Sequence, residues 1–476
     1  MVWQRSRLDQ KILSPSPSFD VSVMQRTQQR KWEIMIKKLF RQHIKVQQER
    51  IARALTECSV DGLIISSGAP ITYFADDQDA PFHATPHFAH WCPERSPFHL
   101  VHLRPGQKAR LVFFSPNDFW HEAPTLMQSE WADEFEIIRV EDQSTRWQIL
   151  GNLRNHAFVG PESKEAEEKG LVANPVQLLN YMDWFRAEKT DYELYCLEQA
   201  SELGAKGHRA VRNAFAQGAS EMEAHHIFLT AIAGREEDLP YPSIIGMDEK
   251  SAILHYQQKR NTKVPQASVM LIDSGGKYQG YCSDITRTYF KASAPATFKS
   301  LLAGMEKLQQ ELCEQVRVGV SFKELHKTCH LRTGQLLVDT DILRNCTAET
   351  AFSLGLTKIF FPHGLGHMLG IQVHDVGGFQ SNERGEQVPP CAEFPTLRMR
   401  RPLRAREVVT VEPGMYFIPM RLDTVRHNEL RSYCNWTLIN ELLPFGGIRI
   451  EDNVVVEAKE SRNLTRAFLG NDFAIS

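Results

Sequence analysis

The chain has 476 residues and a formal net charge of −3, with 42% hydrophobic and 24% charged residues. This length predicts two domains, and the balanced charge without a long basic block argues against nucleic-acid binding. No window approaches a run of apolar residues long enough to cross a bilayer, so we expect no transmembrane helix. Nine cysteines are scattered singly, which is typical of reduced thiols and predicts a cytoplasmic protein.

The first 34 residues differ from the rest of the chain. The Pro/Ser-rich run SPSPSFDVS and the polar stretch after it predict that residues 1–34 form a disordered or weakly held extension. A second methionine, Met35, opens a segment of helical periodicity. We hypothesise that the native chain starts at Met35 and that the upstream residues come from an over-extended reading frame. The apolar positions of the predicted helix are Phe40, Ile44, Ile51 and Leu55.

An N-terminal α/β domain is predicted over residues 35–187. Its first strand is the apolar run 63–65, and four further strands are expected at FHLVHL, ARLVFF, FEIIRV and HAFVG between residues 98 and 160. Residues 180–217 predict helix, and we place the domain boundary near residue 187. Ser220 and Glu223 have the spacing of a capping box before another helix.

Two aspartates lie in the phrase VMLIDSGGKYQGYCSDITRTYF. Asp273 ends an apolar run of strand character, and Asp284 lies in a second run rich in Thr, Tyr and Phe. The glycines between them allow the chain to turn, so paired strands could bring the two carboxylates together. Aspartates on strands are commonplace, however, and this pair alone does not identify a ligand site.

Three histidines, His363, His367 and His374, lie among glycines in FPHGLGHMLGIQVHDVGG. The glycines permit close backbone approach, as a metal site would need. A glycine-rich connection with incidental histidines is the alternative. The helical zinc-protease pattern H-E-x-x-H is absent, which excludes that class.

Two glutamates complete the set of candidate ligands. Glu412 follows the run Val408–Val411, and burying its carboxylate there would be costly unless it is paired or bound to a metal. Arg449 and Glu451 share one face of a predicted strand, for which a simple ion pair is the alternative. Four carboxylates and one imidazole suit Mn²⁺, and also Co²⁺, Fe²⁺ or Zn²⁺. This number of carboxylates offsets the charge of two ions, which can share a hydroxide and polarise a carbonyl.

The order of these five residues resembles that of the pita-bread metallopeptidases, a family that includes methionine aminopeptidase, aminopeptidase P and prolidase. The phrases HGLGHMLGIQVHDVGG, EPGMYFI, PFGGIRIEDN and FADDQDAPFHATPHFAHWCP are most similar to bacterial prolidases (Xaa-Pro dipeptidases) and organophosphorus acid anhydrolases. The resemblance extends from about Met35 to the end of the chain. It implies an α/β (α+β) protein, with a creatinase-like α/β domain followed by a pita-bread catalytic domain over residues 188–476.

The resemblance also implies an activity and partners. It predicts hydrolysis of dipeptides that end in proline, with two divalent metal ions, most readily Mn²⁺, and organophosphate hydrolysis as a possible side activity. It predicts a homodimer. The alternatives are an aminopeptidase P-like enzyme, which shares all five ligands, and an inactive pita-bread binding module, which would be expected to have lost some of them.

Residue roles follow from the same resemblance. Glu412 would both bind metal and shuttle a proton, while His374 and His363 would face the substrate. The implied metal ligands are Asp273, Asp284, His367, Glu412 and Glu451. The implied substrate-binding residues are His255, Arg449, Tyr241 and Asp77, with Asp77 acting on the site of the partner subunit.

Two departures from the family pattern stand out. Met368 occupies a position that is often histidine in relatives. The arginine-rich phrase RMRRPLRARE has no counterpart, and we expect it to form a solvated turn.

Overall fold

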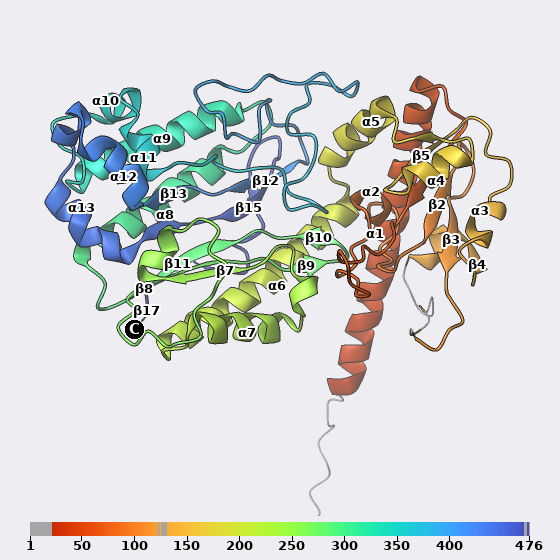
Figure 1. Ribbon diagram of the computed structural model, residues 1–476, viewed down its shortest axis with the longest axis horizontal. Helices are drawn as coiled ribbons and strands as arrows, with labels where there is room; N and C mark the ends of the chain where they lie inside the picture. Colours follow the sequence, from red (N-terminus) through yellow and green to blue (C-terminus); the bar gives the residue numbers. More distant parts are fainter. Residues whose placement is uncertain (1–20, 121, 123, 125–130, 471–473, 476) are drawn as a thin grey trace, which may run out of the picture.

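A long helix, α1 (Val21–Glu57), opens the part of the chain that the computed structural model describes, which is residues 21–120, 122, 124, 131–470 and 474–475 (Figure 1). The helix begins at Val21, upstream of the predicted start at Met35. Residues 1–20, the remainder of the predicted extension, lie outside the described residues. The predicted apolar positions share one face of the helix and are all buried. They are Phe40, Ile44, Ile51 and Leu55.

Helix α1 packs against a mixed sheet with the strand order β4-β3-β2-β1-β5-β6. β1 is antiparallel to β2 and parallel to β5. Leu63 and Ile65 of β1 join the core shared with α1, whereas Ile64 points into a second core on the opposite face, as strand alternation requires. All five predicted runs form strands, and the sheet has a sixth strand, β6, that was not predicted. The strands are β1 (Gly62–Ser66), β2 (Leu100–Leu103), β3 (Arg110–Phe114), β4 (Glu136–Val140), β5 (His156–Val159) and β6 (Val172–Ala173).

The helix predicted over residues 180–217 is in fact two helices, α5 (Val176–Ala187) and α6 (Asp191–Ala216). The break has a local cause, because Thr190 and Glu193 form a capping box that starts α6. The capping box predicted at Ser220 is confirmed, and it starts α7 (Glu221–Ile232). The short helices of the N-terminal half are α2 (Pro86–Ala89), α3 (Thr145–Gln148) and α4 (Ser163–Glu168).

Strands of the C-terminal half form separate small sheets. The largest has the order β17-β11-β8-β7, and β12 pairs with β15 in another. The strands are β7 (Ile244–Met247), β8 (Val269–Asp273), β9 (Lys277–Tyr278), β10 (Tyr281–Cys282), β11 (Thr286–Lys291), β12 (Val408–Val411), β13 (Gly414–Tyr416), β14 (Gly447–Arg449), β15 (Asp452–Val455), β16 (Arg462–Asn463) and β17 (Ala474–Ile475).

These strands lie between two layers of helices. Figure 1 shows α6 and α7 along one side, and α8 (Ala296–Gln315) and α9 (Phe322–Asp339) along the other. The largest apolar core fills the space between α8, α9 and the strands. Because both faces are covered, the strands β8, β12 and β15 are buried along their whole length. The shorter helices are α10 (Ala348–Ser353), α11 (Leu356–Phe360), α12 (Pro419–Arg426) and α13 (Trp436–Leu442).

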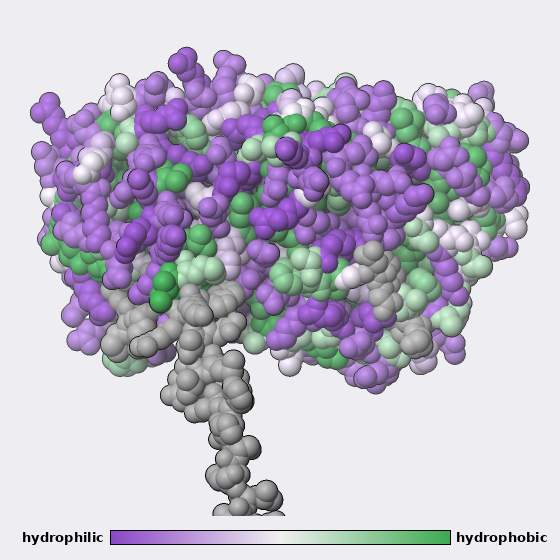
Figure 2. All heavy atoms as spheres, turned by 180° about the vertical axis from the view of Figure 1, so that it is seen from behind, coloured by the Kyte–Doolittle hydropathy of each residue, from purple (hydrophilic) through white to green (hydrophobic). Residues whose placement is uncertain are grey.

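The molecular surface is mainly hydrophilic, with scattered apolar residues on the face shown in Figure 2. Among the described residues, no helix combines the length and apolar character that crossing a bilayer would need. All nine cysteines are free thiols.

Candidate metal centre

Two neighbouring strand ends bring the first pair of carboxylates together. Asp273, the last residue of β8, lies opposite Thr286, the first residue of β11. Thr286 also forms a β-bridge with Glu451. Its hydroxyl donates a 2.8 Å hydrogen bond to Glu451 Oε2. Asp273 and Glu451 therefore flank the same threonine.

Asp284 enters the site from the turn between β8 and β11. The turn needs glycine at Gly275, since a Cβ there would lie 1.8 Å from the Ser283 carbonyl oxygen. The Asp284 amide donates to Asn453 Oδ1 at 3.2 Å, and the Tyr241 hydroxyl donates to Asp284 Oδ1 at 2.5 Å. These contacts fix Asp284 from both its backbone and its side chain.

A third pairing supplies the histidine and the last carboxylate. The Thr410 amide in β12 donates to the His367 carbonyl at 2.9 Å, and the Glu412 amide donates to the Leu365 carbonyl at 2.8 Å. Close approach requires Gly366, because a Cβ there would lie 2.0 Å from the Thr410 carbonyl oxygen. The glycine-rich phrase is therefore an extended segment laid against β12.

All five predicted ligands face one another. His367 Nε2 lies 3.4 Å from Asp284 Oδ2 and 3.8 Å from Glu412 Oε1. One ligand atom from each of Asp284, His367 and Glu451 lies within 4.8 Å of the other two. Asp273 is close enough for its charge, with those of Asp284 and Glu412, to raise the pKa of Glu451.

The proximity of these carboxylates changes their pKa values. Burial, and then the neighbouring carboxylates, raises the pKa of Glu451 well above its ordinary value. Burial also raises the pKa of Asp273, and it raises that of Glu412 to about 7. Burial opposes ionisation of Asp284 and His367 as well, but their hydrogen bond to each other, together with nearby charges and further hydrogen bonds, outweighs it, so that the pKa of Asp284 is lowered and that of His367 is raised. The site therefore concentrates carboxylates whose negative charge bound cations would offset.

The donor atoms fit divalent metal ions. Asp273 Oδ1 is buried and has no hydrogen-bond partner among the described residues. His367 Nδ1 lies 2.9 Å from the Met368 carbonyl oxygen, which can only accept, so Nδ1 keeps a proton and Nε2, which faces the carboxylates, is the nitrogen that a cation would bind. Four carboxylates and one imidazole form a hard, oxygen-rich set that suits such cations.

Arg449 neutralises one side of the site. Its guanidinium donates to Asp273 Oδ2 at 2.7 Å, to the Tyr416 hydroxyl at 2.9 Å and to Thr286 Oγ1 at 3.2 Å. The Tyr416 hydroxyl in turn lies 2.9 Å from His363 Nε2. All three nitrogens of the Arg449 guanidinium therefore donate hydrogen bonds within the chain. Sequence reasoning missed Tyr416, although it stands in the phrase EPGMYFI.

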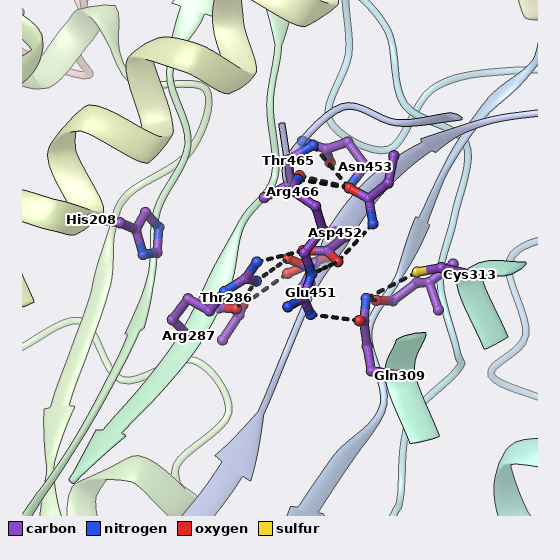
Figure 3. A network of polar contacts seen from close by, with 12 residues as sticks. His208, Thr286, Arg287, Gln309, Cys313, Glu451, Asp452, Asn453, Thr465 and Arg466 are labelled. Atoms are coloured by element: carbon purple, nitrogen blue, oxygen red, sulfur yellow. Dashed lines mark hydrogen bonds and ion pairs between the residues drawn. The ribbon is translucent and has the colours of Figure 1, made fainter. Parts of the chain in front are cut away.

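A buried ionic network contacts the backbone of Glu451 (Figure 3). Arg287 donates to the Glu451 carbonyl at 2.9 Å and to Asp452 Oδ1 at 2.7 Å. The other Asp452 oxygen accepts from Arg466 at 2.6 Å, and Arg466 also donates to Gln309 Oε1 at 2.8 Å. Gln309 reaches the last carbonyl of β12 at 3.2 Å. Helix α8 is therefore tied to the strands that carry two of the carboxylates.

The predicted substrate-facing residues occupy different places. His374 packs edge-on against His367, with 4.4 Å between ring centroids. His255 is exposed, and its charge affects the pKa of both His363 and His374. Asp77 lies on an exposed turn and makes no recorded contact with the site inside the described chain. A role for Asp77 would require a second subunit.

A cavity of about 300 Å³ opens beside His367 and His374, with Asn180, Asp183 and Arg398 among its other lining residues. Burial lowers the pKa of His374 to about 4, and the charges of His367 and Arg398 add to the effect. Arg398 begins the phrase that was expected to be a solvated turn. That expectation is wrong for part of the phrase, because Arg401 and Glu407 are buried.

Arg401 is buried and pairs with both oxygens of the fully buried Glu407. Arg404 also binds Glu407 and stacks 3.6 Å over the Trp184 ring. The three-residue spacing from Arg404 to Glu407 was a signal of local pairing. It holds the arginine-rich segment against the end of α5.

A second cluster of metal-ligand type consists of His43, His90 and Glu193. His90 Nε2 lies 3.2 Å from Glu193 Oε1, which also accepts from the Tyr281 hydroxyl at 3.2 Å. His43 Nδ1 lies 2.8 Å from Thr190 Oγ1. Because these groups already satisfy one another, the cluster joins α1 to α6 as a hydrogen-bond network.

Comparison with known proteins gives matches over both halves of the chain. Residues 195–458 match metallopeptidase family M24, and residues 38–184 match the N-terminal domain of Xaa-Pro dipeptidase. Similar proteins include the Xaa-Pro dipeptidase of Shewanella woodyi, 40% identical over 430 residues, covering 90% of this chain and 97% of the relative. The Xaa-Pro dipeptidase of Pseudoalteromonas atlantica is 37% identical over 433 residues, covering 90% and 98%.

Solved structures of aminopeptidase P from E. coli have a similar fold. The structure with the inhibitor Pro-Leu has a TM-score of 0.69 at 20% identity, covering 91% of this chain and 96% of that one. A zinc-substituted form in complex with product has a TM-score of 0.68 at 21% identity and the same coverage. The likeness confirms the predicted fold, an N-terminal α/β domain followed by a pita-bread domain.

Proposed function

Because the chain belongs to metallopeptidase family M24, we propose that it is a metal-dependent Xaa-Pro dipeptidase, which hydrolyses dipeptides that end in proline. The observation that carries the proposal is the convergence of four carboxylates and one imidazole at one buried place. The Xaa-Pro dipeptidases are 40% and 37% identical to this chain, whereas the aminopeptidase P structure with Pro-Leu is 20% identical, which favours a dipeptidase.

We propose two divalent cations as the resident cofactor, with Mn²⁺ as the first choice because the donors are mostly carboxylate oxygens. When bound, the cations would supply the positive charge that makes water a better nucleophile and polarises the scissile carbonyl. The proposed ligands are Asp273, Asp284, His367, Glu412 and Glu451.

Glu412 is the proposed proton carrier. Without bound cations this carboxyl has a pKa of about 7, and as a metal ligand it would keep a free oxygen edge that can accept a proton from water. Its oxygens face His367 at 3.8 Å and His363 at 3.7 Å. His374, with a pKa of about 4, stays neutral at pH 7. It lines the cavity, where a neutral imidazole can donate a hydrogen bond to an oxygen that gains negative charge.

Recognition of the substrate carboxylate is proposed for the cationic side of the cavity. Arg398 is exposed and lines the cavity beside His374, and His255 is exposed nearby. Arg449 was expected to bind the carboxylate, but its guanidinium is committed to Asp273, Tyr416 and Thr286. We therefore assign charge-assisted recognition to Arg398 first. A carboxylate clamp would restrict the enzyme to dipeptides, because longer peptides lack a carboxylate there.

We further propose a cytoplasmic homodimer. Free cysteines suit a reducing compartment. The turn that carries Asp77 also exposes large apolar side chains, with Phe74 fully exposed and Ile71 75% exposed, as expected of a surface that a second subunit covers. In such a dimer Asp77 would reach the site of the partner subunit.

A dipeptide panel after metal stripping and add-back tests the proposal. We expect Leu-Pro to be cleaved after Mn²⁺ is restored, and neither Leu-Leu nor an X-Pro pentapeptide to be cleaved at a comparable rate. Preference for the pentapeptide would favour aminopeptidase P-like activity, the alternative that the shared fold supports. No stoichiometric metal and no cleavage would favour an inactive binding module.

A further inference from the structure

Three charged side chains from the two halves of the chain meet beside His374. Arg186 Nη2 lies 2.9 Å from Asp375 Oδ1, and Lys189 Nζ lies 2.7 Å from Asp375 Oδ2. The exposed fraction of each side chain is 1% or less. Arg186 and Lys189 belong to the end of α5 and the connection to α6, whereas Asp375 directly follows His374 in the glycine-rich phrase.

This cluster is a poor source of net stability. Two cations share one carboxylate, and two of the three guanidinium nitrogens of Arg186, Nε and Nη1, are buried without a hydrogen-bond partner among the described residues. Desolvating three charges costs about as much as their attraction returns, so such clusters mainly fix one geometry. The geometry fixed here is that of the chain around Asp375.

The cluster leaves that loop little freedom. Lys189 Nζ also donates to the Arg186 carbonyl at 2.8 Å, and Arg186 Nη2 contacts Gln372 Oε1. The Asp375 amide donates to the Met368 carbonyl at 2.9 Å. The loop therefore wraps around the two cations, with His374 held between Gln372 and Asp375.

The connection that carries the cations is itself fastened to the catalytic half. The Lys189 amide donates to the Arg406 carbonyl at 3.0 Å, and Arg406 Nε donates to the Lys189 carbonyl at 2.6 Å. Arg404 donates to the Trp184 carbonyl at 2.9 Å. Because these anchors lie just before β12, the position of the two cations is set relative to the strand that leads to Glu412.

We propose that Arg186 and Lys189 are positioning residues for His374, so that the connection between the two domains sets where this imidazole stands over the candidate metal ligands. The inference rests on the proposed function, in which His374 faces the substrate. Neither cation lines the cavity, so each acts only through Asp375 and the loop.

A double-mutant cycle tests the role. Lys189→Met keeps the length of the side chain and removes its charge, and we expect it to lower kcat by about 10- to 100-fold, the range that small misplacements of a reacting group cause. Bound metal, measured by mass spectrometry, should stay at the wild-type content. In a His374→Ala background the same substitution should cause no further loss, because its effect passes through the missing imidazole.

Arg146→Met is the matched control. Arg146 is also buried and pairs with Glu165 at 3.0 Å, but on the far face of the N-terminal sheet, so kcat should not change. Equal loss of kcat with and without His374, or no loss in a folded Lys189→Met protein, would overturn the proposal. If that variant does not fold, Arg186→Lys, which keeps the charge and loses the guanidinium contact to Gln372, goes through the same cycle with the same outcomes.

The imidazole NMR signal of His374 in the zinc-loaded protein separates this inference from the proposed function. The signal is assigned by its absence in His374→Ala. If the wild type cleaves no Xaa-Pro dipeptide, the proposed function fails, yet Lys189→Met should still shift this signal while Arg146→Met leaves it in place. An unshifted signal in Lys189→Met would count against the positioning role alone.

Discussion

Metal binding should release protons, and the number follows from the site. Burial holds the pKa of Glu412 at about 7 in the metal-free protein, so about half of this carboxyl is protonated at pH 7 and about a tenth at pH 8. Burial and the neighbouring carboxylates also raise the pKa of Glu451 well above its ordinary value. Cations bind only the deprotonated carboxylates. We therefore expect at least about half a proton to leave per site filled at pH 7.

Calorimetry measures this number. Mn²⁺ is titrated into metal-free protein at one pH in several buffers, and the slope of the observed enthalpy against the buffer ionisation enthalpy gives the protons released. Raised pKa values mean that protons compete with the cation as pH falls. The apparent affinity should therefore weaken about tenfold per pH unit for each proton released.

The Glu412→Gln variant supplies the control for this assay. It should release at least about half a proton less than the wild type at pH 7, because the amide has no proton to lose in this range. Stoichiometric binding with a slope of zero in the wild type at pH 7 would refute the reasoning. Such a result would mean that the carboxylates are ionised before the cations arrive.

Three further variants test other contacts. His367→Ala should reduce bound metal below stoichiometry and abolish turnover, as metal analysis and a Leu-Pro assay would show. Arg398→Met should raise KM for dipeptides by about 10- to 100-fold, the value of a charge-assisted hydrogen bond, with a smaller change in kcat. His102 is buried, and neither of its ring nitrogens has a partner within the described chain; burial lowers its pKa to about 3. Between pH 6.5 and 3 the unfolded chain therefore binds a proton at this imidazole that the folded state does not bind, so the free energy of unfolding falls as pH falls. At pH 5 this loss is about 2 kcal/mol, and urea unfolding of His102→Phe should show that it has been removed.

Features encoded within a few residues could be predicted from the sequence. The strands of the N-terminal sheet follow from short apolar runs between turns, and the capping box at Ser220 follows from one spacing. The candidate ligands stand at strand ends or glycine bends, such as Asp273 at the end of β8 and Glu412 after β12. Their convergence came from the family resemblance, since no local pattern says which strand ends will be neighbours.

Contacts between distant segments could not be predicted in this way. Arg186 and Asp375 are separated by 189 positions, and nothing near either residue indicates the other. Arg398 was assigned to a solvated turn because its surroundings are rich in arginine, yet the fold places it on the cavity wall. The break between α5 and α6 did have a local signal in Thr190 and Glu193, which the apolar periodicity on either side obscured.

The protein's own side chains hold most of the site. Four carboxylates repel one another, so without support they would separate when metal is absent. Three of the four are held by a neighbouring side chain: Thr286 holds Glu451, Arg449 holds Asp273, and Tyr241 holds Asp284. The network in Figure 3 then ties the strands beneath them to α8.

This rigidity has an energetic consequence. Because the carboxylates are buried and the scaffold resists their separation, burial and then mutual repulsion raise the pKa values of Glu412 and Glu451. Cation binding then exchanges protons for metal without reordering the backbone, which keeps the entropic cost of binding small. The same scaffold holds the loop of His374 through Asp375, so the candidate metal ligands and the group that faces the cavity share one rigid frame.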